Sequence, residues 1–119
     1  MKEDKKVTTA LAAAELNATE MAVREYFKDI PVMVQIAKCE SHFRHTLADG
    51  SILRGKVDAA DLGVMQINTR YHAARAATLG LDLHLLEDNL EYARDLYEAQ
   101  GTVPWNSSAP CWKRTLAQA

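Results

Sequence analysis

The chain has 119 residues, of which 48% are apolar and 25% are charged, and its formal net charge is −2. This length suits a single domain with one core. No uninterrupted apolar run reaches the roughly 18 residues of a membrane span, which excludes an integral membrane segment. The mixed, nearly balanced charges argue against a nucleic-acid binder that relies on a basic patch. Composition therefore indicates one soluble globular domain.

The N-terminal segment differs in character from the rest of the chain. Residues 1–16 are charged and then alanine-rich, and we interpret them as a leader, an N-terminal extension or an alanine-rich first helix that precedes a single domain over 17–119. The run 7–14 contains two threonines and few strongly apolar residues, so it lacks the apolar segment of a signal peptide. Any export signal is therefore not visible in this sequence.

Helix start and stop signals predict the order of the elements. Asn17 followed by Glu20 is typical of a helix N-terminus, and Pro31 suits the first turn of the next helix. Asn68 is expected to cap a third helix, and Gly80 to end it. The expected helices span 17 to about 28, 31 to about 43, about 69–78 and about 86–100, with a short helical end after Trp112.

The stretch 46–62 reads differently from its neighbours. Asp49-Gly50 is a strong turn signal, and the residues around it alternate between apolar and polar without helical spacing. We therefore expect a short hairpin or irregular loop there. The predicted fold class is mostly α (α+β), with a small β-hairpin or loop insertion between the second and third helices.

One acidic residue of the helix over 31–43 falls on its apolar side. At about 100° per residue, Glu40 lies between Ile36 and Met33, inside the apolar arc of the helix. Desolvation of a carboxylate there would raise its pKa, and a carboxyl group that keeps its proton suits general acid catalysis. The alternative is that Glu40 reaches solvent or pairs with Arg44.

Three short motifs resemble those of one known family. Cys39-Glu40-Ser41-His42-Phe43 is followed about 20 residues later by Gly63-Val64-Met65-Gln66-Ile67-Asn68, and Asp88-Asn89-Leu90 opens the last long helix. Over about residues 30–112 the chain resembles the lytic transglycosylase and goose-type lysozyme superfamily. The resemblance implies a lysozyme-like fold, a monomer, no cofactor and no metal.

The resemblance also implies an activity. Members cleave the β-1,4 bond between N-acetylmuramic acid and N-acetylglucosamine in peptidoglycan glycan strands. Glu40 matches the catalytic acid of the family, which protonates the glycosidic oxygen. In lytic transglycosylases this residue then takes the proton of the muramic acid C6 hydroxyl and a 1,6-anhydro ring closes, whereas in the lysozymes of this class water attacks.

The two cysteines bear on the cellular compartment. Cys39 and Cys111 lie 72 positions apart, a spacing that by itself leaves a disulfide and two buried thiols equally open. Cys39 directly before Glu40, with the late Cys111-Trp112, resembles secreted resuscitation-promoting factors, in which a disulfide joins the catalytic helix to the C-terminal segment. The resemblance thus implies a disulfide and a secreted, periplasmic or cell-envelope protein.

Several further residues are expected at the substrate. Asn89 falls within an apolar arc and must be hydrogen-bonded, so we expect it to brace the catalytic loop. The family's Ala-Tyr-Asn motif is replaced here, and Trp105-Asn106 is its nearest counterpart. The residues that the resemblance places at the glycan are Ser41, Gly63, Met65, Gln66, Asn89, Trp105 and Asn106.

Alternatives remain open at this stage. A hydrolase needs a second carboxylate, which Asp61, or else Asp49 or Asp58, could supply, although all three also fit solvated loop acids. Zinc binding would use Cys39, His42, His45 and Cys111. A catalytically inactive glycan-binding module and an unrelated helical interaction domain are the other two alternatives.

Overall fold

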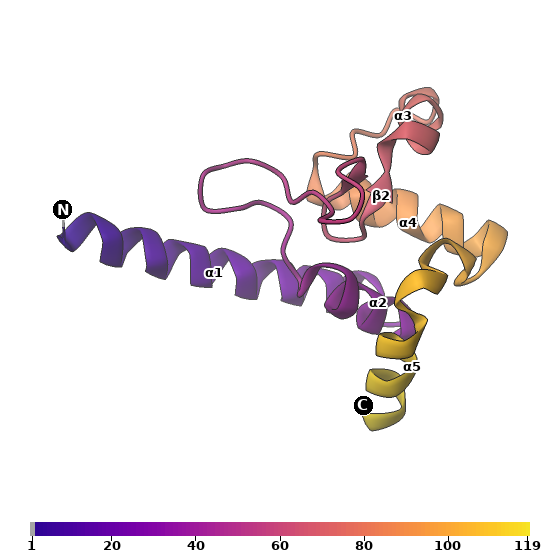
Figure 1. The fold of residues 1–119 in the computed structure, drawn as a ribbon, viewed down its shortest axis with the longest axis horizontal. Helices are drawn as coiled ribbons and strands as arrows, with labels where there is room; N and C mark the ends of the chain where they lie inside the picture. The colour runs from indigo at the N-terminus through magenta and orange to yellow at the C-terminus, as the bar shows by residue number, and fades with distance from the viewer. Residues whose placement is uncertain (1) are drawn as a thin grey trace.

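The computed structural model describes the backbone of residues 2–119, together with the side chains of residue 10 and of residues 13–119. Over this range the chain is mostly helical, with one small antiparallel sheet between the second and third helices (Figure 1). The predicted fold class is therefore confirmed. The elements are α1 (Lys2–Tyr26), α2 (Pro31–Ser41), β1 (Asp61–Leu62), β2 (Ile67–Asn68), α3 (Thr69–Thr78), α4 (Leu86–Gln100), the 3-10 helix η1 (Val103–Ser108) and α5 (Ala109–Gln118).

Helix α1 corrects the expected first helix. It runs without a break from Lys2 to Tyr26, so Asn17 is an exposed residue of the helix interior and not its cap. Glu20 pairs with Arg24 one turn later instead of serving a capping box. The alanine-rich segment upstream has high helix propensity, and this outweighs the capping signal. In Figure 1 the N-terminal half of α1 extends away from the other helices.

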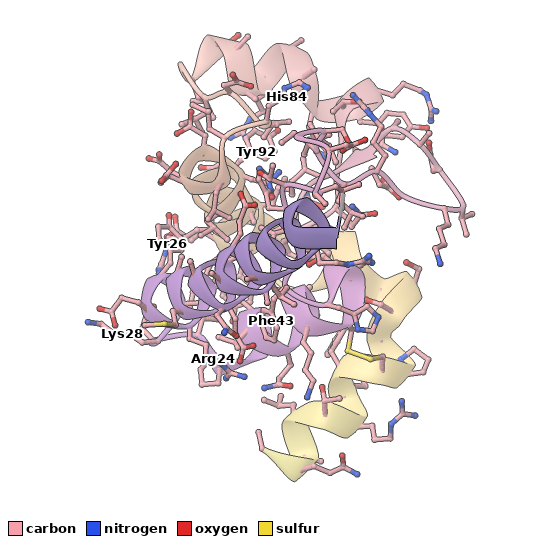
Figure 2. The ribbon with its side chains drawn as sticks, turned by 90° about the vertical axis from the view of Figure 1, so that its left-hand side faces the viewer. Arg24, Tyr26, Lys28, Phe43, His84 and Tyr92 are labelled. Carbon is pink, nitrogen blue, oxygen red and sulfur yellow. A yellow bond between two sulfur atoms is a disulfide. The ribbon has the colours of Figure 1, made fainter. Side chains whose placement is uncertain are left out.

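Helix α2 begins at Pro31, as predicted, and ends two residues early, at Ser41. The backbone leaves the helix because His42 and Phe43 both have left-handed φ values, 53° and 60°. A disulfide between Cys39 and Cys111 joins α2 to α5, with 6.1 Å between the Cα atoms, and is visible as the yellow bond in Figure 2. The disulfide that the resemblance implied is thus present.

The core fills the space between the C-terminal part of α1, α2, the small sheet and α4. An ion pair supports it from outside: the Arg94 guanidinium on α4 donates to both carboxylate oxygens of Asp29, at 2.9 and 3.0 Å, and to the Tyr26 carbonyl. Trp105 and Trp112 close the core on the C-terminal side. The largest fully buried apolar side chains are Trp105, Tyr92, Phe27, Met33, Ile36, Leu62, Met65, Ile67, Val23 and Val64.

The insertion between α2 and α3 is mostly irregular loop. Its one regular part pairs Asp61 with Asn68 and Leu62 with Ile67, which brackets a tight turn. The Asn68 side chain then caps α3 by accepting from the Arg70 amide at 3.0 Å, as predicted. Helices α3 and α4 have the predicted bounds, whereas α5 begins at Ala109, before the predicted point. None of the described helices combines the length and apolar character that crossing a bilayer requires.

Candidate active-site cleft

The C-terminal end of α2 opens onto an elongated groove. Glu40 lines a first hollow of about 370 Å³, whose far wall is the loop over residues 53–57. A second hollow of about 360 Å³ continues along β2, α3 and η1. The two hollows meet at Asp61, Gln66 and Ser107, which line both. The groove can therefore accommodate an extended, polar ligand.

Glu40 is partly buried at the floor of the first hollow. Burial raises the pKa of its carboxyl group, a hydrogen bond from Ser108 lowers that pKa, and the charge of Asp61 raises it further. The expected alternative partner, Arg44, lines the same hollow but does not pair with Glu40: its Nε donates to the Ser41 carbonyl at 3.0 Å. The helical spacing predicted that the Glu40 carboxyl group would be partly buried, and the structure agrees. Glu40 forms no ion pair with Arg44.

Ser108 is the polar partner of Glu40, and sequence reasoning missed it. Its hydroxyl donates to Glu40 Oε2 at 3.1 Å and also lies 3.1 Å from the Trp105 carbonyl. A hydroxyl in this position serves both protonation states of Glu40. It donates to the carboxylate, or it accepts from the carboxylic acid while donating to the Trp105 carbonyl. No local sequence pattern predicts this contact, because Ser108 comes from the far end of η1.

Asp61 is the second acidic group of the cleft. It opens β1 and lines both hollows, and its Oδ1 accepts from the Asn68 side-chain amide at 3.0 Å. Burial raises the pKa of Asp61, and the hydrogen bond from Asn68 lowers this pKa by a smaller amount. Since the charge of Asp61 also raises the pKa of Glu40, the two carboxyl groups share one electrostatic environment.

The other two loop acids have structural partners. Asp49 is exposed and accepts hydrogen bonds from the Ser51 amide and hydroxyl, which lower its pKa. Asp58 accepts from the Ala60 amide at 2.9 Å and pairs with Arg70, and it lines only the second hollow. Asp61 is therefore the one of the three that faces the same hollow as Glu40.

The turn over residues 63–66 places Gln66 where the two hollows meet, whereas Gly63 is buried and lines neither hollow. Gly63 has φ 77°, and a Cβ there would lie 2.6 Å from both Asn89 Nδ2 and His45 Cε1, so no other residue fits. Gln66 also has a left-handed φ, 52°, and its side chain donates to the Gly63 carbonyl at 2.9 Å. Such strain in a non-glycine residue is maintained only by its surroundings, and it often marks functional sites.

Asn89 braces this turn from below, as we expected. Its Oδ1 accepts from the Met65 amide at 3.0 Å, and its Nδ2 donates to the Leu62 and Leu83 carbonyls at 3.1 and 2.9 Å. Asn89 is fully buried and lines neither hollow. Ser41 and Met65 are also fully buried, and the Ser41 hydroxyl donates to the Ala37 carbonyl. These three residues lie beneath the cleft and do not face it.

His45 is a second brace that the sequence did not reveal. Its Nδ1 accepts from the Val64 amide at 3.0 Å, and its Nε2 donates to the His84 carbonyl at 2.7 Å. Both bonds require the neutral ring with the proton on Nε2, and burial accordingly lowers the pKa of His45.

The zinc alternative loses its sulfur ligands, because the disulfide consumes both cysteines. Among the described residues, no three His, Cys, Asp or Glu side chains gather in a metal-binding arrangement.

Trp105 and Trp112 support the turn from the C-terminal side, and Trp105 also lines the second hollow. Trp105 is 2% exposed and donates from Nε1 to the Met65 carbonyl at 2.9 Å, while Trp112 donates to the Trp105 carbonyl. Asn106 is exposed and lines neither hollow. Tyr71 faces the second hollow, and the Tyr92 hydroxyl lies 2.8 Å from His72 Nδ1. Neither tyrosine contacts Glu40, which has Ser108 as its hydroxyl partner instead.

The arrangement can donate a proton to a ligand in the groove and take one back. Glu40 supplies the proton, Ser108 stabilises both of its protonation states, and Asp61 adds a second carboxyl group. Comparisons with protein-family models, curated proteins and solved structures found no match to this chain.

Proposed function

We propose that the protein is a peptidoglycan-cleaving glycosidase that acts on the N-acetylmuramic acid–β-1,4–N-acetylglucosamine bond as a lytic transglycosylase. The observation that carries the proposal is Glu40, a partly buried carboxyl group with a raised pKa and no paired cation, at the floor of an elongated polar groove. The motifs around Glu40, Gln66 and Asn89 resemble those of the lytic transglycosylase superfamily, which supports the same activity and a lysozyme-like fold.

In the proposed mechanism Glu40 acts twice. Its proton passes to the glycosidic oxygen as the bond from the muramic acid C1 breaks, so that the leaving sugar departs with a hydroxyl group. The resulting Glu40 carboxylate then accepts the proton of the muramic acid C6 hydroxyl. As that proton leaves, the C6 oxygen forms a bond to C1. The products are a 1,6-anhydro sugar and a free chain end, and Glu40 regains its proton. Ser108 supports this cycle because its hydroxyl bonds either form of the carboxyl group.

A hydrolytic muramidase is the second candidate, and Asp61 is the observation that favours it. Asp61 lines the Glu40 hollow and has a raised pKa. A hydrolase uses a second carboxyl group to activate water or to stabilise the sugar cation. In a transglycosylase the substrate's own acetamido group assists, and the second carboxyl group is dispensable.

The disulfide supports a secreted, periplasmic or cell-envelope location. Disulfides persist in oxidising compartments and are rare in the cytosol. Peptidoglycan is found in the same compartments, so the expected location agrees with the proposed substrate.

The test is clearing of purified peptidoglycan by the wild type and by Glu40→Gln. The amide cannot donate the proton, so we expect clearing to fall by about 10²- to 10⁴-fold. Glu98→Gln makes the same chemical change at an exposed residue of α4 and serves as the control. Undiminished clearing by Glu40→Gln would refute the mechanism, and binding without clearing by the wild type would indicate the inactive module.

Mass analysis of the products separates the two candidates. Anhydro ends, lighter by one water, identify a transglycosylase, and reducing ends identify a hydrolase. Asp61→Asn adds an independent readout. We expect it to retain most activity in a transglycosylase and to lose most of it in a hydrolase.

A further inference from the structure

Three cationic side chains line the hollow that contains Glu40. Arg44 follows the end of α2, and Arg54 and Lys56 lie on the loop between α2 and β1 that forms the opposite wall. All three are exposed. Their gathering at one cleft is notable in a chain whose formal net charge is −2.

These three cations have no carboxylate partner among the described residues. Arg44 and Arg54 each donate to a backbone carbonyl, of Ser41 and Ala59, and the Lys56 side chain makes no hydrogen bond to any described residue. Four of the other five arginines pair with a carboxylate, in Arg24–Glu20, Arg70–Asp58, Arg75–Asp95 and Arg94–Asp29, and the exception in the described part of the chain is the exposed Arg114.

The carboxyl groups of the cleft do not neutralise these cations either. The pKa of Glu40 is raised, and only the hydrogen bond from Ser108 acts to lower it. For Asp61 the cation that lowers the pKa is Arg70, which lies outside the first hollow. Arg44, Arg54 and Lys56 therefore keep their charges available to a ligand in the groove.

Charge is distributed unevenly along the groove. The first hollow has the three cations on its walls, whereas no lysine or arginine lines the second hollow. Asp61 lines both hollows, and the second hollow adds Asp58 together with aromatic and amide side chains. An extended ligand that is anionic at one position would consequently bind with that position in the first hollow.

We infer that Arg44, Arg54 and Lys56 form an anion subsite that binds a carboxylate carried by the muramyl sugar of the substrate. This inference rests on the proposed function and specifies its substrate class. Strands of N-acetylglucosamine alone are neutral. A muramyl sugar carries a lactyl carboxyl group, which is either free or extended into a peptide with carboxylates of its own. The subsite thus selects muramyl glycan over chitin and places the muramyl sugar in the first hollow, beside Glu40.

The test measures binding by the Glu40→Gln protein, which cannot turn the ligand over. The ligands are chitin oligosaccharides, muramyl glycan strands stripped of peptide and strands that retain the peptide, matched in length and titrated by calorimetry at low and high salt. We expect muramyl strands to bind more tightly than chitin. The difference should shrink at high salt, because exposed ion pairs are screened.

Removal of the cations identifies the subsite. Each exposed ion pair contributes at most about fivefold in affinity, equivalent to about 1 kcal/mol, so Arg54→Gln/Lys56→Gln should weaken muramyl binding by up to about 25-fold and leave chitin binding unchanged. Lys56→Gln alone keeps the loop intact, since its side chain contacts no described polar group, and should cost up to about fivefold. Lys38→Gln/Arg114→Gln removes the same charge from exposed positions outside the groove and should have no effect.

The outcomes separate this inference from the proposed function. Preference for both kinds of muramyl strand assigns the lactyl carboxylate as the ligand, and preference for the peptide-bearing strand alone assigns the peptide carboxylates. Equal binding of chitin and muramyl strands, or a preference that survives in both cleft variants, refutes the anion subsite while the glycan cleft stands. Absence of binding to all three ligands refutes the proposed function and the subsite together.

Discussion

Replacing Asn89 by aspartate exchanges one atom of the buried brace beneath the cleft, because an oxygen takes the place of Nδ2. Asn89 is fully buried, and its Nδ2 donates to the Leu62 and Leu83 carbonyls while its Oδ1 accepts from the Met65 amide. In Asn89→Asp the accepted bond persists. The two donated bonds are replaced by the approach of an oxygen to two carbonyl oxygens.

The expected cost at neutral pH follows from these contacts. Two neutral hydrogen bonds contribute about 1 kcal/mol each. An uncompensated charge left in a buried site raises the total to about 3–5 kcal/mol. A domain of this size is stable by about 5–15 kcal/mol, so the variant folds but with much reduced stability.

The pH dependence has a defined sign. Burial raises the pKa of the new carboxyl group in the folded state above its unfolded value of about 3.9, so the folded state binds more protons. Stability relative to the wild type is therefore highest below pH 4 and falls as the pH rises through the folded pKa. A protonated aspartic acid restores one of the two donated bonds.

Urea unfolding between pH 4 and 8, followed by the fluorescence of the two tryptophans, measures this difference. Asn89→Ala loses all three bonds, including the one from the Met65 amide, and adds no ionisable group, so its deficit relative to the wild type should not change with pH. If the deficits of Asn89→Asp and Asn89→Ala remain parallel across the pH range, the aspartate does not face the two carbonyls and the brace is misassigned.

Three further predictions address the cleft and the fold. Ser108→Ala removes a hydrogen bond that lowers the pKa of Glu40, so the descending limb of the activity profile in peptidoglycan clearing should move to higher pH; an unmoved limb argues against the contact. Burial lowers the pKa of His45 below 6.5, so the folded state binds fewer protons than the unfolded state. The free energy of unfolding should therefore fall as the pH drops below about 6.5. His45→Gln should remove this pH dependence in urea titrations. Cys39→Ser/Cys111→Ser opens a link spanning 72 positions and should cost about 4 kcal/mol in the free energy of unfolding; an unchanged urea midpoint would contradict this value.

Local signals were sufficient where the structure depends on local physics. The Asn68 cap, the proline at the start of α2 and the spacing of apolar residues predicted α3, α4 and the beginning of α2 correctly. The same spacing placed Glu40 and Asn89 on buried faces, because helical periodicity fixes the direction of a side chain relative to the core. The capping signal at Asn17 failed, since the alanine-rich segment before it extends the helix.

What the sequence determined by itself was the helical framework, the burial of Glu40 and Asn89 and the family resemblance that suggests a glycosidase. Only the tertiary structure decided which side chains meet. Ser108 reaches Glu40 across 68 positions, and Asp61, not Asp49 or Asp58, faces the same hollow. The physical reason is range: propensity and periodicity act over a few residues, whereas these contacts form only when packing and the disulfide bring distant segments together.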